Sequence, residues 1–408
     1  MNVLHLNQSD IHGGAAIAAY RLHQGLRRLN VNSRLLVPEA KLKEETTTVL
    51  PPMTLAERAL FAMTRRWAPN NTNLLRSRKL LKTPAYQQAD VIHLHNLHTG
   101  LYFNYLTIPR ITREKPTVFT LHDMWSFTGH CAFSYDCQRW QEGCGQCPYP
   151  ETYPAVQWDN TAIEWLLKQI VYTHSKLTII TPSRWLSALA KKSLLSQFPI
   201  HTIPYGIDTQ VYRPLDKAAS RHQLGLPQDK TILMFGCADL ADFRKGMDLL
   251  VKVLETLPSP IKRTLVLYAM GKESTALPEI AGIKTIQGGF VEGDAEKVLR
   301  YSAADIFLST TRADNLPLVL QESLACGIPL FSTDVGGVSD LVRDGVTGFT
   351  APIENIKAMA ARLLELIQNN ELRRNMAEHC RHIAMEEYAL EIIARKHKVL
   401  YETLLTPP

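Results

Sequence analysis

The sequence predicts an α/β protein built from two parallel-sheet domains, and three observations lead to this prediction. The chain has 408 residues, more than one ordinary hydrophobic core holds. Short apolar runs that suit buried strands alternate with helical patterns, as where Val3–Leu6 precedes Ala15–Leu22. Glycine and polar residues follow these runs, as at Gly13-Gly14. In a parallel sheet the carboxyl ends of strands are where ligands bind.

Composition narrows the class of protein further. Hydrophobic residues make up 45% and charged residues 21%, which is typical of a globular chain, and the net charge of +6 is modest. We find no apolar run of the roughly 18 residues that a membrane span needs, and no pattern of a nucleic-acid-binding module. The start, MNVLHLNQSD, lacks the basic region of a secretory signal. We therefore expect a cytoplasmic protein that can also contact the inner face of a membrane.

The first half of the chain reads as strands and helices in alternation. Strands are expected near residues 3–6, 31–37, 90–95, 117–122 and 177–181, and helices near 15–22, 161–172 and after Ser183, a candidate cap. The segment from about 41 to 85 has no clear pattern apart from a helical stretch at Leu55–Trp67. Its basic and aromatic residues could meet a lipid-phosphate surface, or could line a solvated helix face (Arg65, Arg66, Trp67, Arg76, Arg78, Lys79).

The second half repeats the alternation. Strands are expected near 231–235, 265–268, 285–291, 305–309 and 330–333, and helices from Met247, from Pro317 and after Gly337. Asn355 is a plausible cap for a long helical pattern that reaches Tyr401 and breaks near Tyr388.

Four of the seven cysteines fall within one short stretch. They are Cys131, Cys137, Cys144 and Cys147, and the last two form a CxxC pair. In a reducing compartment such clustering favours a tetrahedral structural zinc over disulfides. Unconnected thiols or redox-active pairs are the alternatives that spacing leaves open. Histidines also end two of the expected strands, but on separate strands and without the spacing of a helical zinc motif, so we do not expect a catalytic metal there.

Two acids stand out beside the helix that starts at Pro317. Asp314 lies in the loop before this helix and Glu322 lies within it. An acid near a helix start is common for electrostatic reasons alone. A carboxylate at the end of a strand is also well suited to accept hydrogen bonds from sugar hydroxyls.

The motif around these acids resembles that of a known enzyme family. Asp314, Glu322 after seven intervening residues, then Ser-Leu-Ala-Cys-Gly-Ile-Pro, Val-Gly-Gly and Gly-Val-Thr-Gly-Phe are similar to the donor-sugar motif of the retaining glycosyltransferases of family 4. The Asp-Asn-Leu-Pro loop resembles a bacterial branch with colanic-acid-type and other exopolysaccharide transferases. The resemblance implies the GT-B fold, two Rossmann-like domains facing across a cleft, with a C-terminal helix returning to the first domain.

The resemblance also implies roles for individual residues. Glu322 would hold the nucleotide ribose, and Asp314, where the family usually has Glu, would contact the donor sugar together with the loop residues Asn315 and Leu316. Gly14 would lie beside the diphosphate. Lys245 matches a cation that neutralises the leaving group, while Arg244 would substitute for an arginine that Cys237-Ala238 replaces. His122 would face the transferred sugar and make up the catalytic set with Asp314 and Lys245.

These inferences lead to one expected organisation and function. Residues 1–205 would form the acceptor-side domain with the cysteine-rich loop 131–147, residues 206–385 the nucleotide-sugar-binding domain, and residues 386–408 the returning helix. The chain would be a retaining, hexosyl-type glycosyltransferase that moves a sugar from a UDP or GDP donor to a glycan or lipid-linked acceptor in cell-surface polysaccharide synthesis. Catalysis would need no cofactor, because the cations are side chains. A nucleotide-sugar epimerase and a non-catalytic GT-B partner of a polysaccharide-assembly complex are the alternatives. A nicotinamide oxidoreductase fits less well, since no Gly-x-Gly-x-x-Gly follows the first strand.

Overall fold

The computed structural model describes residues 1–64, 72, 75–98, 101–272 and 279–406, so Arg65, Arg66 and Trp67 lie outside the described residues. The chain divides into two compact units. Unit 1 comprises Met1–Gly206 with Leu390–Pro408, and unit 2 comprises Ile207–Ala389. The sequence placed the corresponding boundaries at 205/206 and 385/386.

Unit 1 is built on a parallel sheet with strand order β3-β2-β1-β4-β5-β6-β7. Its strands are β1 (Asn2–Leu6), β2 (Asn32–Val37), β3 (Thr47–Val49), β4 (Val91–Leu94), β5 (Thr117–Thr120), β6 (Thr178–Thr181) and β7 (Ile200–Thr202). Its helices are α1 (Gly14–Arg28), α2 (Leu55–Thr64), α3 (Ser77–Leu80), α4 (Pro84–Gln88), α5 (Ile108–Glu114), α6 (Thr161–Thr173), α7 (Arg184–Ala190) and α15 (Leu390–Leu405).

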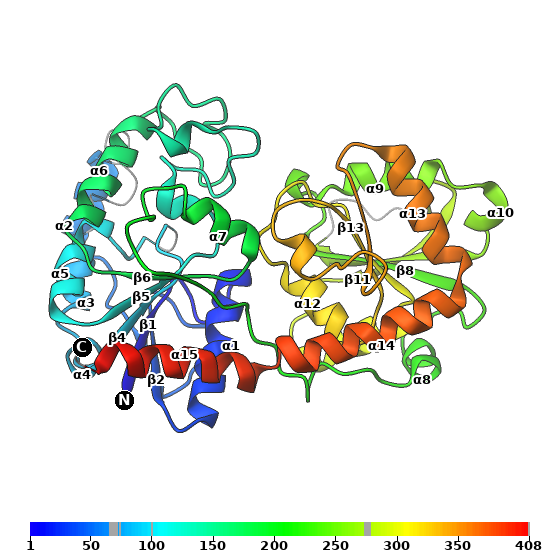
Figure 1. Ribbon diagram of the computed structural model, residues 1–408, viewed down its shortest axis with the longest axis horizontal. Coiled ribbons are helices and arrows are strands. Elements are labelled where there is room, and N and C mark those ends of the chain that lie inside the picture. Colours follow the sequence, from blue (N-terminus) through cyan, green and yellow to red (C-terminus); the bar gives the residue numbers. More distant parts are fainter. Residues whose placement is uncertain (65–71, 73–74, 99–100, 273–278, 407–408) are drawn as a thin grey trace. The chain divides into compact units, whose positions relative to one another are not determined.

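Two helices from opposite ends of the chain lie side by side in unit 1. In Figure 1 the blue α1 and the red α15 run together beside the sheet. A Cβ added at Gly25 of α1 would lie 2.9 Å from side-chain atoms of Leu390 and Ala394. The helix α15 can therefore approach α1 this closely only because residue 25 is a glycine and has no side chain.

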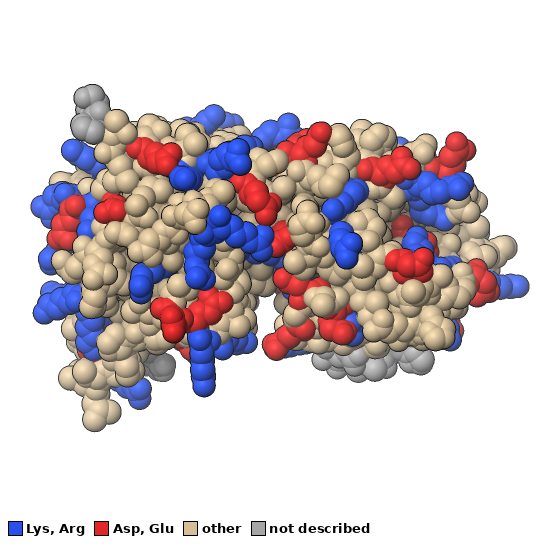
Figure 2. Space-filling view, turned by 90° about the horizontal axis from the view of Figure 1, so that it is seen from below, with Lys and Arg blue, Asp and Glu red and all other residues tan. Residues whose placement is uncertain are grey.

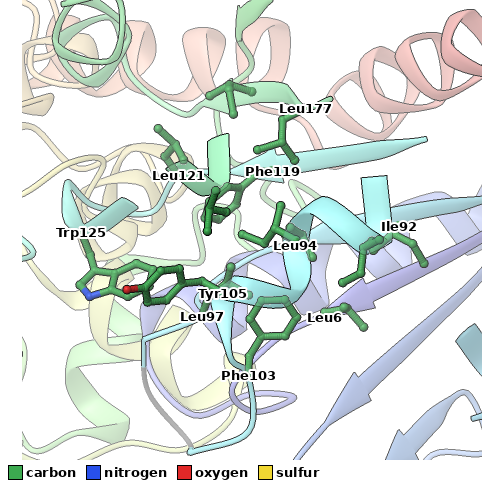
Figure 3. Packing of buried hydrophobic residues seen from close by; sticks show 14 of the residues in the cluster. Leu6, Ile92, Leu94, Leu97, Phe103, Tyr105, Phe119, Leu121, Trp125 and Leu177 are labelled. Carbon is green, nitrogen blue, oxygen red and sulfur yellow. The ribbon is translucent and has the colours of Figure 1, made fainter. Parts of the chain in front are cut away.

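The largest apolar cluster of unit 1 packs against the sheet. Figure 3 shows strand residues such as Leu6, Leu94 and Phe119 pointing toward Phe103 and Trp125 from the connecting segments. All five are at most 3% exposed. Both faces of a parallel sheet are covered, so the side chains of its strands are mostly apolar on both sides. Such strands appear in the sequence as short apolar runs, and they could be predicted for this reason.

Unit 2 contains a second seven-stranded sheet with order β10-β11-β9-β8-β12-β13-β14, parallel except for the β10–β11 pair. Its strands are β8 (Thr231–Asp239), β9 (Leu265–Lys272), β10 (Glu279–Ile280), β11 (Ile283–Gly289), β12 (Ile306–Ser309), β13 (Leu330–Thr333) and β14 (Gly348–Ala351). Its helices are α8 (Lys217–Gln223), α9 (Met247–Glu255), α10 (Ser259–Lys262), α11 (Asp294–Ala303), α12 (Leu318–Ala325), α13 (Ile356–Gln368) and α14 (Asn370–Glu387).

Two sequence expectations for unit 2 were wrong in detail. The helix expected after Gly337 is a single 3₁₀ turn, η5 (Val338–Asp340). The long helical pattern from Asn355 has a second break at Asn369, because the Asn369 side chain accepts a hydrogen bond from the Leu372 N–H and starts α14. An asparagine favours such a cap over a helix interior.

The surface carries both signs of charge. Figure 2 shows Lys and Arg interspersed with Asp and Glu over the face it displays. Within the part of the chain that the structure describes, no helix combines the length and apolar character needed to cross a membrane.

Candidate functional site

A loop after β8 carries the two cations that the sequence singled out. Asp242 caps the 3₁₀ turn η4 (Phe243–Lys245) by accepting a hydrogen bond from the Arg244 N–H. Gly246 then takes a left-handed conformation with φ of 71°. An added Cβ there would lie 1.9 Å from the carbonyl oxygen of Thr310. Only glycine therefore fits where this loop meets the end of β12.

Asp314 is the point on which both cations converge. Its Oδ2 accepts a hydrogen bond from Lys245 Nζ at 2.6 Å and lies 3.3 Å from Arg244 Nη1. Its Oδ1 accepts the N–H of Asn315 at 3.0 Å. Arg244 also donates to the carbonyl oxygen of Ala313, so the guanidinium is fixed in the loop. The shorter acid at this position thus reaches both cations.

This arrangement keeps Asp314 ionised. Burial alone would raise the pKa of its carboxyl, but the charges of Lys245 and Arg244, with hydrogen bonds from Lys245 and Asn315, hold the pKa below its ordinary value. The site therefore combines a fixed carboxylate with two adjacent cations at the carboxyl ends of β8 and β12. Such a group can bind a phosphate and a neighbouring hydroxyl.

Glu322 lies on α12 and is 2% exposed. Its Oε2 accepts a hydrogen bond from the hydroxyl of Tyr301 at 3.0 Å, and its Oε1 lies 4.0 Å from Lys297 Nζ. The structure therefore places Glu322 between α12 and α11, while Asn315 and Leu316 are buried in the loop before α12. Sequence reasoning missed Tyr301 and Lys297 because their helical pattern alone gives no sign of a polar partner.

The position where the resembled family has an arginine is occupied by Cys237. It is 7% exposed, and its Sγ donates to the carbonyl oxygen of Asp239 at 3.2 Å. Burial raises the pKa of this thiol to about 11, so it carries no charge near pH 7. Arg244 and Lys245 are the cations beside Asp314 in the structure.

In unit 1, Gly14 is the first residue of α1, directly after β1 and its loop. The first turn of α1 holds no acidic residue, so the N–H groups at this helix start can meet an anion. The loop is anchored by Asp10, whose carboxylate accepts hydrogen bonds from the N–H groups of Ile11, Lys41 and Leu42. Asp10 could not be singled out from the sequence, because two of its three partners lie 31 and 32 residues away.

His122 follows β5 and has a polar partner on each ring nitrogen. Its Nε2 lies 3.1 Å from Nδ1 of His95, and its Nδ1 lies 2.8 Å from the hydroxyl of Tyr205. The Tyr205 ring also stacks on it at a centroid distance of 5.4 Å. Burial lowers the pKa of His122 to about 3, so the ring is neutral near pH 7. The next residue, Asp123, accepts a hydrogen bond from the Trp125 N–H and lies 3.6 Å from His98 Nε2.

The strand-end histidines come closer together than we expected. Among the described residues, His5, His93 and His95 form the one group of three whose potential ligand atoms lie within 4.8 Å of one another. His5 and His93 are aligned on the neighbouring strands β1 and β4. However, the centroids of the His93 and His95 rings lie 4.1 Å apart, and the angle between the ring planes is 32°. Ring lone pairs lie in the ring plane, so this geometry does not aim the two rings at one ion.

The four cysteines of the loop 131–147 do not form such a group. Cys144 Sγ accepts the Gly129 N–H at 3.1 Å, and Cys147 Sγ lies 3.2 Å from Nε2 of His130. Burial raises the pKa of Cys131 to about 12 and of Cys144 to about 11, which keeps both thiols protonated. A zinc ion here stays a prediction.

The basic residues that could meet a lipid surface differ in their exposure and in their partners. Arg76 is buried and donates to the carbonyl oxygens of Leu50 and Pro51, so its expected surface role was wrong. Lys79 pairs with Glu57 at 2.6 Å, whereas Arg78 is exposed.

A cavity in unit 2 does not coincide with these residues. It measures about 470 Å³ and is bordered by Asp305 and Pro329, which precede β12 and β13. Asp314 and Lys245 lie at the opposite edge of the sheet, after the carboxyl ends of β12 and β8.

Comparisons with known proteins agree with this picture. Residues 12–211 match the model described as Glycosyltransferase Family 4, and residues 216–382 match that of Glycosyl transferases group 1. The chain is 30% identical over 372 residues to WcaC of Escherichia coli (strain K12), named as a colanic acid biosynthesis glycosyl transferase, covering 84% of this chain and 85% of that one.

Solved structures show the same fold. Sucrose-phosphate synthase from Thermosynechococcus elongatus superposes with a TM-score of 0.71 at 17% identity, covering 99% of this chain and 98% of that one. HepE from Anabaena, solved in complex with UDP-glucose, superposes with a TM-score of 0.70 at 15% identity, covering 99% of this chain and all of that one. The fold is thus that of the GT-B glycosyltransferases, as the sequence predicted.

The family follows from the sequence matches. The chain belongs to glycosyltransferase family 4 and to its exopolysaccharide branch.

Proposed function

We propose that this protein transfers a sugar from a nucleoside diphosphate donor to a hydroxyl of a glycan or lipid-linked acceptor, with retention of anomeric configuration, in cell-surface polysaccharide synthesis. The observation that carries the proposal is the convergence of Lys245 and Arg244 on Asp314, at the carboxyl ends of β8 and β12. The UDP-glucose in the structure of HepE supports a nucleotide sugar as donor.

The cations would act on the leaving group. As the bond between the anomeric carbon and the phosphate oxygen breaks, the diphosphate gains negative charge, which Lys245 and Arg244 stabilise. The acceptor oxygen bonds to the anomeric carbon on the same face, and its proton passes to the leaving phosphate oxygen. This step needs no metal ion, because the positive charge comes from side chains.

The acids would hold the donor in place. Glu322 would bind the ribose hydroxyls, and Asp314 would accept a hydrogen bond from a hydroxyl of the sugar. Its Oδ1 accepts the Asn315 N–H and retains capacity for another donor. In unit 1, the N–H groups at Gly14 would lie beside the diphosphate, and the ring of His122 would face the transferred sugar.

Two further proposals concern parts outside the chemistry. We propose that the four cysteines of loop 131–147 bind a structural zinc. We also propose a peripheral membrane contact through α2, where no residue is buried and Leu55 and Met63 are 85% and 72% exposed. Vesicles with and without anionic lipid would test the second proposal by sedimentation of the wild type and of Leu55→Ser.

The test of the reaction is a donor panel. The protein is incubated with UDP-hexoses and GDP-hexoses, with and without polyprenyl-diphosphate-linked glycans, and released nucleotide and glycan mass are measured. Transfer from one donor class, with a product whose anomeric proton coupling matches the donor, is expected. Interconversion of the donor without transfer would indicate an epimerase, and binding without turnover would indicate a non-catalytic partner.

A further inference from the structure

A cavity of about 470 Å³ lies in unit 2 at the amino ends of β12 and β13, and nothing in the proposed reaction uses it. In Figure 1 it lies where α8, α12 and α14 come together. We call it the α14 pocket. Its polar border consists of Lys217, Ser302, Asp305, Asn370, Arg373 and Arg374. A cavity of this size is typical of sites that bind small molecules.

The wall of the α14 pocket carries an excess of positive charge. Three cations and one carboxylate border it. The carboxylate belongs to Asp305, and its Oδ1 accepts a hydrogen bond from Lys217 Nζ at 2.8 Å. Its Oδ2 accepts a hydrogen bond from Arg221, which lies outside the border. The negative charge of Asp305 is therefore already shared between two cations, and it does not balance the two arginines of the pocket.

Neither of these arginines is paired with an acid among the described residues. Arg373 donates hydrogen bonds to neutral oxygens, the carbonyl of Ile367 and the side chain of Asn370. Burial lowers the pKa of Arg373, and the opposing effect of the charge of Asp305 is smaller. Arg374 is exposed, and its side chain has no hydrogen bond or ion pair within the described part of the chain.

The start of α14 adds to the positive potential of the pocket. Asn369 caps this helix, and both arginines follow within its first two turns. The N–H groups at a helix start carry partial positive charge, so an anion stabilises this end of a helix and a cation does not. Glu371 lies in the first turn, but it is exposed and does not border the pocket. An anion in the pocket would offset the charge of the helix start and of the two arginines together.

The rest of the border is mostly apolar. Pro214 and Leu215 contribute from the segment before α8, and Ile328 and Pro329 contribute from the turn before β13. The side chain of Leu215 is 39% exposed. A bare inorganic ion would leave this apolar surface in contact with water, whereas a ligand with a hydrocarbon or aromatic body would cover it. The two kinds of wall together fit an anion that carries an apolar body.

We propose that the α14 pocket binds an organic anion, a phosphate or carboxylate carried on an apolar body, with Arg374 and Lys217 as its charged ligands. Lys217 can serve because an ammonium group has three N–H donors and Asp305 takes one of them. The apolar body covers Leu215 and Ile328. This site is separate from the proposed donor site, which lies at the opposite edge of the same sheet.

Calorimetric titration of the full chain with phenyl phosphate, benzoate and phenol tests the chemistry of the ligand. The three probes share one aromatic ring, and only the first two are anions near pH 7. We expect one site per chain for at least one of the anions and much weaker binding of phenol. The anion that binds more tightly identifies phosphate or carboxylate as the preferred group. Binding of neither anion, or binding of phenol as tight as that of the anions, would overturn the proposal.

The variant Arg374→Met tests the location of the site. It should weaken binding of the preferred anion by about tenfold or more, because a hydrogen bond between two charged groups is lost. Arg263→Met is the matched control, since Arg263 is exposed in unit 2 and does not border the pocket. Ala377→Phe keeps every charge but reduces the cavity that Ala377 borders, so it should also weaken binding. Wild-type affinity in Arg374→Met, or in Ala377→Phe with a native circular dichroism spectrum, would overturn the proposal.

A second variant separates this site from the candidate functional site. Phenyl phosphate could also meet the cations beside Asp314, so the titration is repeated with Lys245→Met. We expect this variant to bind the anion with the affinity of the wild type. Loss of binding in Lys245→Met but not in Arg374→Met would place the anion at the candidate functional site and overturn the proposal. Wild-type protein that binds the anion as expected but neither UDP nor GDP would refute the transferase function and leave the α14 pocket standing.

Discussion

Acidification should destabilise unit 1 selectively, because its buried histidines stay neutral in the fold. Burial lowers the pKa of His23 and His397 to about 4 and that of His98 and His122 to about 3. In the unfolded chain the same rings titrate near the ordinary value of about 6.5. Between these values the unfolded state binds more protons, so the free energy of unfolding is highest above pH 6.5 and decreases as the pH falls toward 4.

The size of the effect follows from the same values. A pH of 5 lies about 1.5 units below the pKa of a histidine in the unfolded chain. Each ring that stays neutral in the fold therefore lowers the free energy of unfolding by about 2 kcal/mol at this pH. Four such rings amount to about 8 kcal/mol, a large fraction of the stability of a typical domain. His201 on β7 is exposed and serves as the control position.

Tryptophan fluorescence is the natural assay. All six tryptophans precede residue 206, so their emission reports on unit 1. Urea titrations at pH 7.5 and pH 5.0 should show a loss of several kcal/mol in the free energy of unfolding. The variant His397→Gln should reduce this difference by about 2 kcal/mol, and His201→Gln should leave it unchanged. A difference below about 1 kcal/mol in the wild type would refute the reasoning.

Three further predictions concern single residues. Lys245→Met should weaken UDP or GDP binding about tenfold to a hundredfold, measured by calorimetry, whereas Lys252→Met on the exposed side of α9 should not; equal affinities would contradict the role of Lys245. Gly246→Ala should cost about 3 kcal/mol or more in urea unfolding followed by circular dichroism, since its Cβ would meet Thr310. Gly225→Ala, with φ of 66° but open space, should cost about 1 kcal/mol, and similar losses would argue against the steric account. The wild type should contain about one zinc per chain by elemental analysis and Cys144→Ser much less; zinc-free wild type would rule out the metal.

The sequence predicted the fold where burial makes strands continuous and apolar. Val3–Leu6 and Asp305–Ser309 are such runs, and Ser183 and Asn355 are caps whose side chains accept the hydrogen bonds expected of them. In residues 41–85 the sequence indicated only the helical stretch from Leu55, which corresponds to α2, a helix that buries none of its side chains.

From the sequence, the candidate site could be predicted only where its residues belong to one local motif. Asp314 and Glu322 lie within one motif, and their loop and helix were evident. The partners Tyr301, Tyr205 and His95 could not be inferred, because they depend on which strands and helices become neighbours. His5 and His93 illustrate the point, since their alignment follows from the β1–β4 pairing, which no spacing in the sequence records.

The central claim, that unit 2 binds a nucleoside diphosphate sugar through Glu322 and the cations at Asp314, is tested most directly by calorimetric titration with UDP and GDP. The variant Glu322→Gln keeps the size of the side chain but removes its charge, and Glu255→Gln, exposed at the end of α9, is its control. We expect selective binding of one nucleotide to the wild type and to Glu255→Gln, and binding that is at least tenfold weaker in Glu322→Gln. Binding of neither nucleotide, or equal binding by Glu322→Gln, would contradict it.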